Sequence, residues 1–126
     1  MNMKKLENDD KQRLISALEG TGLRNLFLIN NLRKYRIGSE TEVYEAGDVI
    51  VMNWMKTSVC IARLGDDYPT EDIITLLHSM EFSGLNGPEE ALRPLEGYLS
   101  STFDISYREM LKADRNTFRR KSPRDE

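Results

Sequence analysis

Apolar positions in the N-terminal part of the chain repeat with the period of an α-helix. A first helix is predicted within "ENDDKQRLISALEGTG", where Leu14 and Leu18 share one face and glycines follow. A second helix is predicted within "LRNLFLINNLRKYRIG", with Gly38 as its C-cap. The apolar stripe of this second helix is broad, which favours packing against a sheet over lying on the surface.

From Thr41 the apolar period changes to that of strands. The stretch "TEVYEAGDVIVMNWMKTSVCIARLG" is rich in Val, Ile, Tyr and Trp, and two turn signals divide it. We predict strands over about 41–46, 49–55 and 58–64, joined as an antiparallel meander. Both faces of the middle strand are largely apolar. A strand of this kind is covered on both sides, so helices are expected on both faces of the sheet.

The rest of the chain alternates helix and strand. A central helix with Thr70 as its N-cap is predicted first, and then a short strand over about 82–85. The next helix begins at Pro88, and Pro94 should kink or restart it after one turn. A last strand is predicted within "STFDISYREMLKA". The order of elements is that of an α/β fold with a mixed, mostly antiparallel sheet.

Composition and charge narrow the class of protein. The chain has 126 residues, of which 39% are hydrophobic and 31% charged, and its formal net charge is -3. These values predict one globular domain over 1–111, and the basic stretch 112–126, which lacks apolar periodicity, is predicted to be a flexible tail. No apolar run is long enough for a membrane span, and no apolar segment follows the N-terminal lysines as in a secretory signal. We therefore expect a cytoplasmic protein that does not bind membranes.

The mild acidity argues against nucleic acid as the partner, because such binders usually carry a concentrated basic face. The alternative is that the basic tail is an arm for a polyanion, with salt-dependent binding to RNA or DNA as its signature.

No catalytic or metal-binding constellation stands out in the sequence. Cys60 lies in an apolar run, which predicts a buried structural thiol. His78, the single histidine, falls between the apolar stripes of its helix and is expected on the surface without a metal. Asp66 and Asp67 could bind a cation or act as acid and base, although acidic residues are common where helices begin. We expect no catalytic residue and no metal site.

The element order resembles the GCN5-related N-acetyltransferase (GNAT) fold, in which helices follow a first strand and precede a meander, a central helix and a strand–helix–strand unit. The first strand of that fold is not recognisable in this sequence. Three stretches resemble the N-terminal domain of two-domain bacterial acetyltransferases of this family: "NLFLINNLRKYRIGSETEVYE", "EDIITLLHS" and "SGLNGPEEALRPLEGYL". The resemblance covers roughly residues 23–111. It implies a degenerate copy of the fold, with acetyl-CoA bound by a second, C-terminal copy.

The turn between the third predicted strand of the meander and the central helix decides whether this chain resembles an active member. In active members, main-chain N–H groups of this turn hold the pyrophosphate of acetyl-CoA at the positive end of the helix. Here the turn reads "ARLGDDYPTEDI", in which Arg63 and Gly65 are present but the spacing departs from the family motif and no second glycine follows. The place for a pyrophosphate is surrounded by four carboxylates, those of Asp66, Asp67, Glu71 and Asp72. Because each like-charge contact at about 4 Å costs on the order of 1 kcal/mol in water, no cofactor is expected for this chain alone.

Three hypotheses of function follow. The first is a non-catalytic domain that contributes substrate positioning or domain packing beside a C-terminal acetyltransferase domain. The second is a stand-alone protein-interaction module, such as a small bacterial regulator or an immunity-type protein. The third is a divergent active acetyltransferase that uses acetyl-CoA. Tyr35, Tyr44 and Trp54 are the candidate cleft or interface residues, and a protein partner or a second copy of the chain is the expected occupant.

Overall fold

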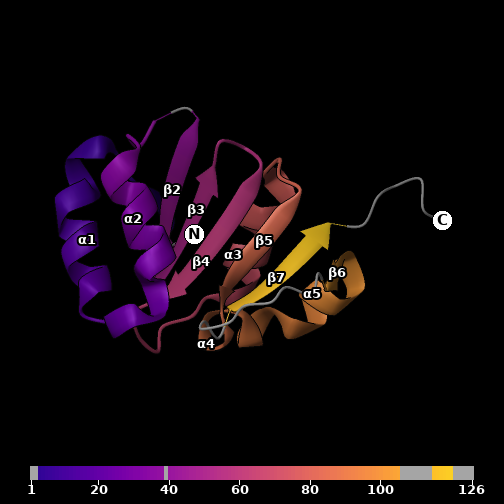
Figure 1. Ribbon diagram of the computed structural model, residues 1–126. Helices are drawn as coiled ribbons and strands as arrows, with labels where there is room; N and C mark the ends of the chain where they lie inside the picture. Colours follow the sequence, from indigo (N-terminus) through magenta and orange to yellow (C-terminus); the bar gives the residue numbers. More distant parts are fainter. Residues whose placement is uncertain (1–2, 39, 106–114, 121–126) are drawn as a thin grey trace.

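The computed structural model of the chain describes residues 3–38, 40–105 and 115–120 (Figure 1). Its strands are β1 (Met3–Lys5), β2 (Thr41–Ala46), β3 (Val49–Trp54), β4 (Ser58–Arg63), β5 (Gly84–Pro88), β6 (Phe103–Ile105) and β7 (Arg115–Arg120). They form one 7-stranded sheet in the order β1-β2-β3-β4-β5-β7-β6. Only β4 and β5 pair in parallel, and every other neighbouring pair is antiparallel. The prediction of an α/β fold with a mixed, mostly antiparallel sheet is confirmed.

The helices fall between these strands. They are η1 (Asn8–Asp10), α1 (Lys11–Glu19), η2 (Gly22–Asn25), α2 (Leu26–Lys34), α3 (Thr70–Ser79), α4 (Glu89–Leu92), η3 (Arg93–Leu95) and α5 (Glu96–Thr102), where η marks a 3₁₀-helix. In Figure 1, α1 and α2 lie in front of the sheet, whereas α3 lies behind it. No helix in the described part of the chain is long and apolar enough to cross a membrane.

The core consists of two apolar clusters, one on each face of the sheet. Successive side chains of a strand point to opposite faces, and β3 shows this directly. Val49 and Val51 join the cluster under α3, α4 and α5, while Ile50 and Met52 join the cluster under α1 and α2. All four side chains are fully buried. The prediction of helices on both faces is therefore confirmed.

The predicted meander matches β2, β3 and β4 to within one residue at each end. The strand predicted over about 82–85 begins and ends later, at Gly84–Pro88. Pro94 lies in η3 between α4 and α5, so it interrupts the helix as predicted.

Two predicted helix ends are wrong. The second helix ends at Lys34 rather than at Gly38, because Tyr35 is extended (φ -120°, ψ 149°) and caps it. Thr70 is the first residue of α3 and not its N-cap, which is Pro69, and no side chain caps this helix end.

The two ends of the chain differ from the prediction in one way each. β1 was not recognised, because its three residues are too short to show an apolar period, yet they pair with β2. Within the stretch predicted to be a flexible basic tail, Arg115–Arg120 forms β7, so that part of the prediction is wrong. Main-chain pairing with both β5 and β6 holds β7 in the sheet and needs no apolar period. The last predicted strand is observed at Phe103–Ile105, and its continuation over 106–111 lies outside the described residues.

Candidate functional site

The loop between β4 and α3, residues 64–69, is bound to the turn between β2 and β3. The main-chain N–H of Leu64 donates to the carbonyl oxygen of Asp48 at 2.6 Å, and that of Asp48 donates to the carbonyl oxygen of Asp67 at 2.7 Å. The N–H of Asp67 donates to Oδ2 of Asp48 at 3.0 Å. The Asp48 carboxylate therefore already accepts one main-chain donor of this loop.

Two glycines allow the turn and the loop to come this close. A Cβ atom placed on Gly65 would lie 2.5 Å from Oδ2 of Asp48. A Cβ atom on Gly47, where φ is +58°, would lie 2.7 Å from the carbonyl oxygen of Asp67. Gly65, which the sequence offered as part of a phosphate motif, is instead covered by the Asp48 carboxylate.

Arg63 and Tyr68 attach the same loop to α4. The Arg63 guanidinium donates to the carbonyl oxygens of Gly65 (2.8 Å) and Glu90 (3.2 Å), and it lies 5.2 Å from the centre of the Tyr68 ring. The Tyr68 hydroxyl donates to the carbonyl oxygen of Ala91 at 2.5 Å. Burial raises the pKa of Tyr68 well above its usual range, and the nearby Arg63 charge opposes this shift only in part. Arg63 and Tyr68 thus use their side-chain donors to bind main-chain carbonyl oxygens of the protein itself.

Acidic side chains surround the beginning of α3, as the sequence indicated. Glu71 and Asp72 lie in the first turn of the helix, and Asp66 and Asp67 are exposed in the loop before it. The described residues contain no group of three or more His, Cys, Asp or Glu side chains that could hold a metal ion. Chemically, the arrangement places the protein's own carboxylates near the positive end of the helix, without a side-chain cap.

The structure brings together two of the three predicted cleft residues. Tyr35 and Trp54 meet edge to face, with ring centroids 5.8 Å apart, on the face covered by α2. Nε1 of Trp54 is buried and has no acceptor among the described residues. Tyr44 lies on the opposite face, where it packs against the cluster under α3. A cavity of about 290 Å³ adjoins Tyr35 and the exposed side chain of Met55.

A second cavity, which the sequence did not reveal, lies at the C-terminal end of α3. Its volume is about 320 Å³, and it is lined by Glu42, Tyr44, Asn53, Lys56, Ser79, Met80 and Glu81. These residues come from β2, β3, the turn after β3 and the end of α3. Asn53 was the available signal, because it is the one polar residue in the strand "VIVMNW".

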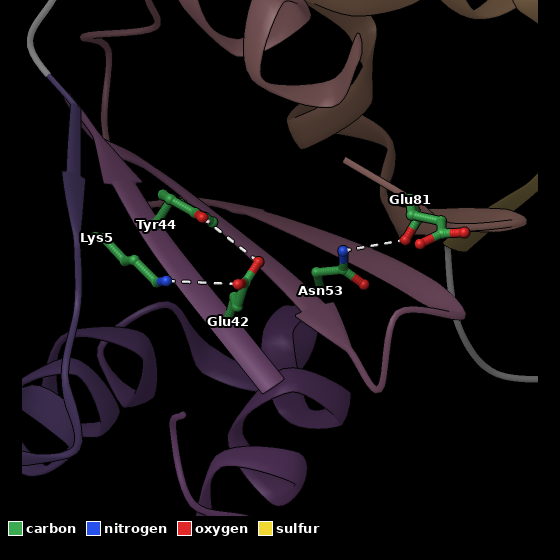
Figure 2. Close-up of polar contacts among 5 residues, drawn as sticks. All are labelled: Lys5, Glu42, Tyr44, Asn53 and Glu81. Carbon is green, nitrogen blue, oxygen red and sulfur yellow. Dashed lines mark hydrogen bonds and ion pairs between the residues drawn. The ribbon is translucent and has the colours of Figure 1, made fainter. Parts of the chain in front are cut away.

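Polar contacts connect the walls of this cavity (Figure 2). Glu42 pairs with Lys5 at 3.4 Å through Oε2 and accepts a hydrogen bond from the Tyr44 hydroxyl at 3.4 Å through Oε1. Burial, followed by the charge of Glu42, raises the pKa of Tyr44. The Asn53 amide nitrogen donates to the carbonyl oxygen of Glu81 at 3.3 Å. Asn53 is only 2% exposed, and its Oδ1 is buried without a partner among the described residues.

The two remaining candidates lie as predicted. Cys60 is buried in the cluster under α1 and α2. His78 is exposed on α3 and contacts the ring of Tyr98 edge to face, with centroids 5.2 Å apart.

No protein-family model, curated protein or solved structure matches this chain.

Proposed function

We propose that this chain is a non-catalytic domain of the GNAT fold, which positions a substrate or packs against a catalytic domain and does not itself transfer an acyl group. The order of elements supports this proposal. A first strand (β1) precedes α1 and α2, and the meander, the central helix and a strand–helix–strand unit follow. This is the order of the fold that the sequence resembles, including the strand that the sequence did not reveal.

The observation that carries the proposal is the position of the Asp48 carboxylate. In the resembling family, main-chain N–H groups of the turn before the central helix bind the pyrophosphate of acetyl-CoA. Here the N–H of Asp67 already donates to Asp48, which also covers Gly65. A pyrophosphate at this turn would have to displace that carboxylate. It would also meet the charges of Asp66 and Asp67, at on the order of 1 kcal/mol per contact in water and more in a drier site.

The two halves of the proposal are not equally supported. Domain packing through an open sheet face would leave a broad exposed apolar patch. In the described part of the chain, helices lie on both faces of β2, β3 and β4, and Leu26 and Met55 are the exposed large hydrophobic side chains. Leu26 begins α2 and Met55 follows β3, so each lies at the edge of its element. Among the described residues, domain packing therefore lacks the broad apolar patch that it would use.

Calorimetric titration with acetyl-CoA and with CoA, up to millimolar ligand, tests the proposal. We expect no saturable heat from the unmodified chain, while an active acetyltransferase of the GNAT family, titrated in parallel, serves as the positive control. Saturable binding that is weakened when Gly65 is replaced by Val would overturn the proposal and support a divergent active enzyme. Binding of equal affinity in the Gly65→Val variant would mean that acetyl-CoA binds elsewhere on the chain. That result would also contradict the proposal, which expects no cofactor.

The alternative, a stand-alone interaction module, differs in how the chain associates. Sedimentation velocity at low and high salt separates the two. A monomer at all concentrations fits a domain whose partner is another chain. Self-association that weakens with salt would favour a charge-driven module, because surface ion pairs are screened beyond about 10 Å at 0.1 M salt.

A further inference from the structure

We propose that the cavity beside Tyr35 and Met55 binds a small organic anion, namely a carboxylate carried on a compact apolar body. The cavity has a volume of about 290 Å³ and is lined by Tyr35, Arg36, Gly38, Glu40, Thr41 and Met55. In Figure 1, the turn after β3 and the beginning of β2 lie at the upper end of the sheet. This inference does not rest on the proposed function, because the loop before α3 follows the end of β4, at the opposite end of the sheet.

Thr41 supplies a polar group to the wall of the cavity. It pairs with Trp54 across β2 and β3, so both side chains lie on the face covered by α2. Thr41 is only 3% exposed, and no described residue is hydrogen-bonded to its hydroxyl. This hydroxyl is nevertheless not among the buried polar atoms that lack a partner, so the little surface that Thr41 retains includes its oxygen. The hydroxyl can therefore donate to a ligand in the cavity.

Charge and an available donor group favour an anion. The Arg36 guanidinium is exposed and makes no ion pair or hydrogen bond with a described residue. Such a group can bind both oxygens of a carboxylate. The Lys34 ammonium adds a second positive charge, 5.6 Å from the centre of the Tyr35 ring. Glu40 and the C-terminal end of α2 oppose them, but the helix end is equivalent to only about half a negative charge. The two cations outweigh these contributions.

The turn after β3 gives the cavity an apolar wall in a strained backbone. Met55 and Lys56 are the central residues of this turn, in which the Thr57 N–H donates to the carbonyl oxygen of Trp54 at 3.0 Å. Both have left-handed backbones, with φ of 55° and 61°. Asn-Gly fits such a turn with less strain than two residues with long side chains. The Met55 side chain is 42% exposed and lines the cavity, where an apolar body of a ligand would cover it.

Nuclear magnetic resonance titration of the full chain, followed by the Met55 methyl signal at constant ionic strength, tests the proposal. Three probes share a cyclohexane ring and differ in charge: cyclohexanecarboxylate, cyclohexylmethanol and cyclohexylmethylammonium. A fourth probe, acetate, lacks the apolar body. We expect a saturable shift with cyclohexanecarboxylate and binding at least about tenfold weaker with each of the others. The fluorescence of Trp54, whose ring contacts that of Tyr35, gives a second readout.

Substitutions of polar residues and a matched control test the charge. Arg36→Gln should weaken binding of cyclohexanecarboxylate about tenfold, by loss of one charge–charge contact. Glu40→Gln should strengthen it about twofold to threefold, because a repelling charge is removed. Thr41→Val should weaken binding, and its amide fingerprint spectrum reports whether the fold is retained. Arg33→Gln is the control, because Arg33 lies in the last turn of α2 and is exposed but pairs with Glu19. It should change the affinity less than about twofold.

Two glycine substitutions separate the ligand from the turn, with Trp54 fluorescence as the readout. Met55→Gly removes the apolar wall and relieves the left-handed backbone. It should therefore raise the midpoint of thermal unfolding and weaken binding at least about tenfold. Lys56→Gly relieves the same kind of backbone, but Lys56 lines the cavity at the end of α3 instead. It should raise the midpoint and change the affinity less than about threefold.

Four outcomes would overturn the proposal: no saturable shift with cyclohexanecarboxylate, equal binding of any other probe, full affinity in Met55→Gly, or a loss on Arg33→Gln as large as that on Arg36→Gln. Equal binding of cyclohexylmethanol would mean apolar contact alone, and equal binding of acetate would mean charge alone. The last outcome would mean that anions gather along the basic end of α2 rather than in this cavity.

Discussion

The main-chain N–H of Asp67 donates a 3.0 Å hydrogen bond to the carboxylate of Asp48. This contact joins the turn between β2 and β3 to the loop that leads into α3. It places a carboxylate against the main chain of that loop, and it makes the turn and the loop one structural unit. Substitutions at Asp48 and at Gly47 measure how much this unit contributes to the free energy of unfolding.

Replacing Asp48 with Ala should lower the free energy of unfolding by about 1–2 kcal/mol, because the Asp67 N–H loses a charged acceptor. Urea unfolding followed by the fluorescence of Trp54, the single tryptophan, measures this. Asp66→Ala is the matched control, because the Asp66 side chain is fully exposed and lies 4.0 Å from Arg63. We expect that control to stay within about 0.5 kcal/mol of the unmodified chain. Equal losses in both variants would show that the Asp48 contact contributes no more than an exposed charge.

Gly47→Ala should destabilise the chain by roughly 2–4 kcal/mol. The left-handed backbone at φ +58° costs about 1–2 kcal/mol for a residue with a Cβ atom, and that atom would lie 2.7 Å from the carbonyl oxygen of Asp67. Gly97→Ala is the control, because Gly97 lies in α5 and a Cβ atom added there would meet nothing within 4 Å. It should stabilise by about 0.5–1 kcal/mol, the usual helix preference for Ala. Thermal unfolding of both variants gives the comparison, and a neutral Gly47→Ala would contradict the close packing of turn and loop.

Local patterns in the sequence were sufficient for the centre of the fold. Runs rich in Val, Ile, Tyr and Trp between turn signals defined β2, β3 and β4, because each of these strands is six residues long and largely buried. β1 has three residues, and β7 is rich in arginine, so neither has an apolar period to detect. Both are strands because a neighbouring strand supplies main-chain partners, and that information lies elsewhere in the chain.

The candidate sites also differ in whether their residues are contiguous in the sequence. The acidic turn before α3 is contiguous in sequence, so its charge could be predicted, but the role of Asp48 could not, because it comes from another turn. The cavity near Asn53 is assembled from two strands and a helix end, with no fixed spacing between its residues. The sequence offered Tyr35, Tyr44 and Trp54 together as cleft or interface residues. Tyr35 and Trp54 contact each other, whereas the strand of Tyr44 directs it to the other face.

The pKa shift of Tyr68 predicts a loss of stability in alkaline solution. Burial raises the folded-state pKa above the usual value of about 10, so the folded chain keeps a proton that the unfolded chain releases. The contribution of Tyr68 to stability is therefore complete below about pH 10 and declines as the pH rises further. Tyr68→Phe should lower the free energy of unfolding by about 1 kcal/mol at neutral pH, because the Ala91 carbonyl loses its donor. Above pH 10, the free energy of unfolding of this variant should fall less steeply than that of the unmodified chain. Urea unfolding of both proteins at a series of pH values gives the two slopes, and parallel slopes would contradict the prediction.

The edge-to-face contact between Tyr35 and Trp54 predicts an energetic coupling that Tyr44 does not share. The 5.8 Å separation and 64° interplanar angle are within the range in which aromatic pairs contribute about 0.5–1.5 kcal/mol beyond burial. A double-mutant cycle of Tyr35→Leu and Trp54→Leu, followed by circular dichroism, should therefore give a coupling of that size. The same cycle with Tyr44→Leu is the control and should be additive within about 0.5 kcal/mol, because Tyr44 lies on the opposite face of the sheet. Tyr35→Leu alone should also shift the emission of Trp54 to longer wavelength, since the indole loses the ring that shields it. If both cycles were additive, Tyr35 would be held by its own chain and by Lys34, whose ammonium lies 5.6 Å from its ring, rather than by Trp54.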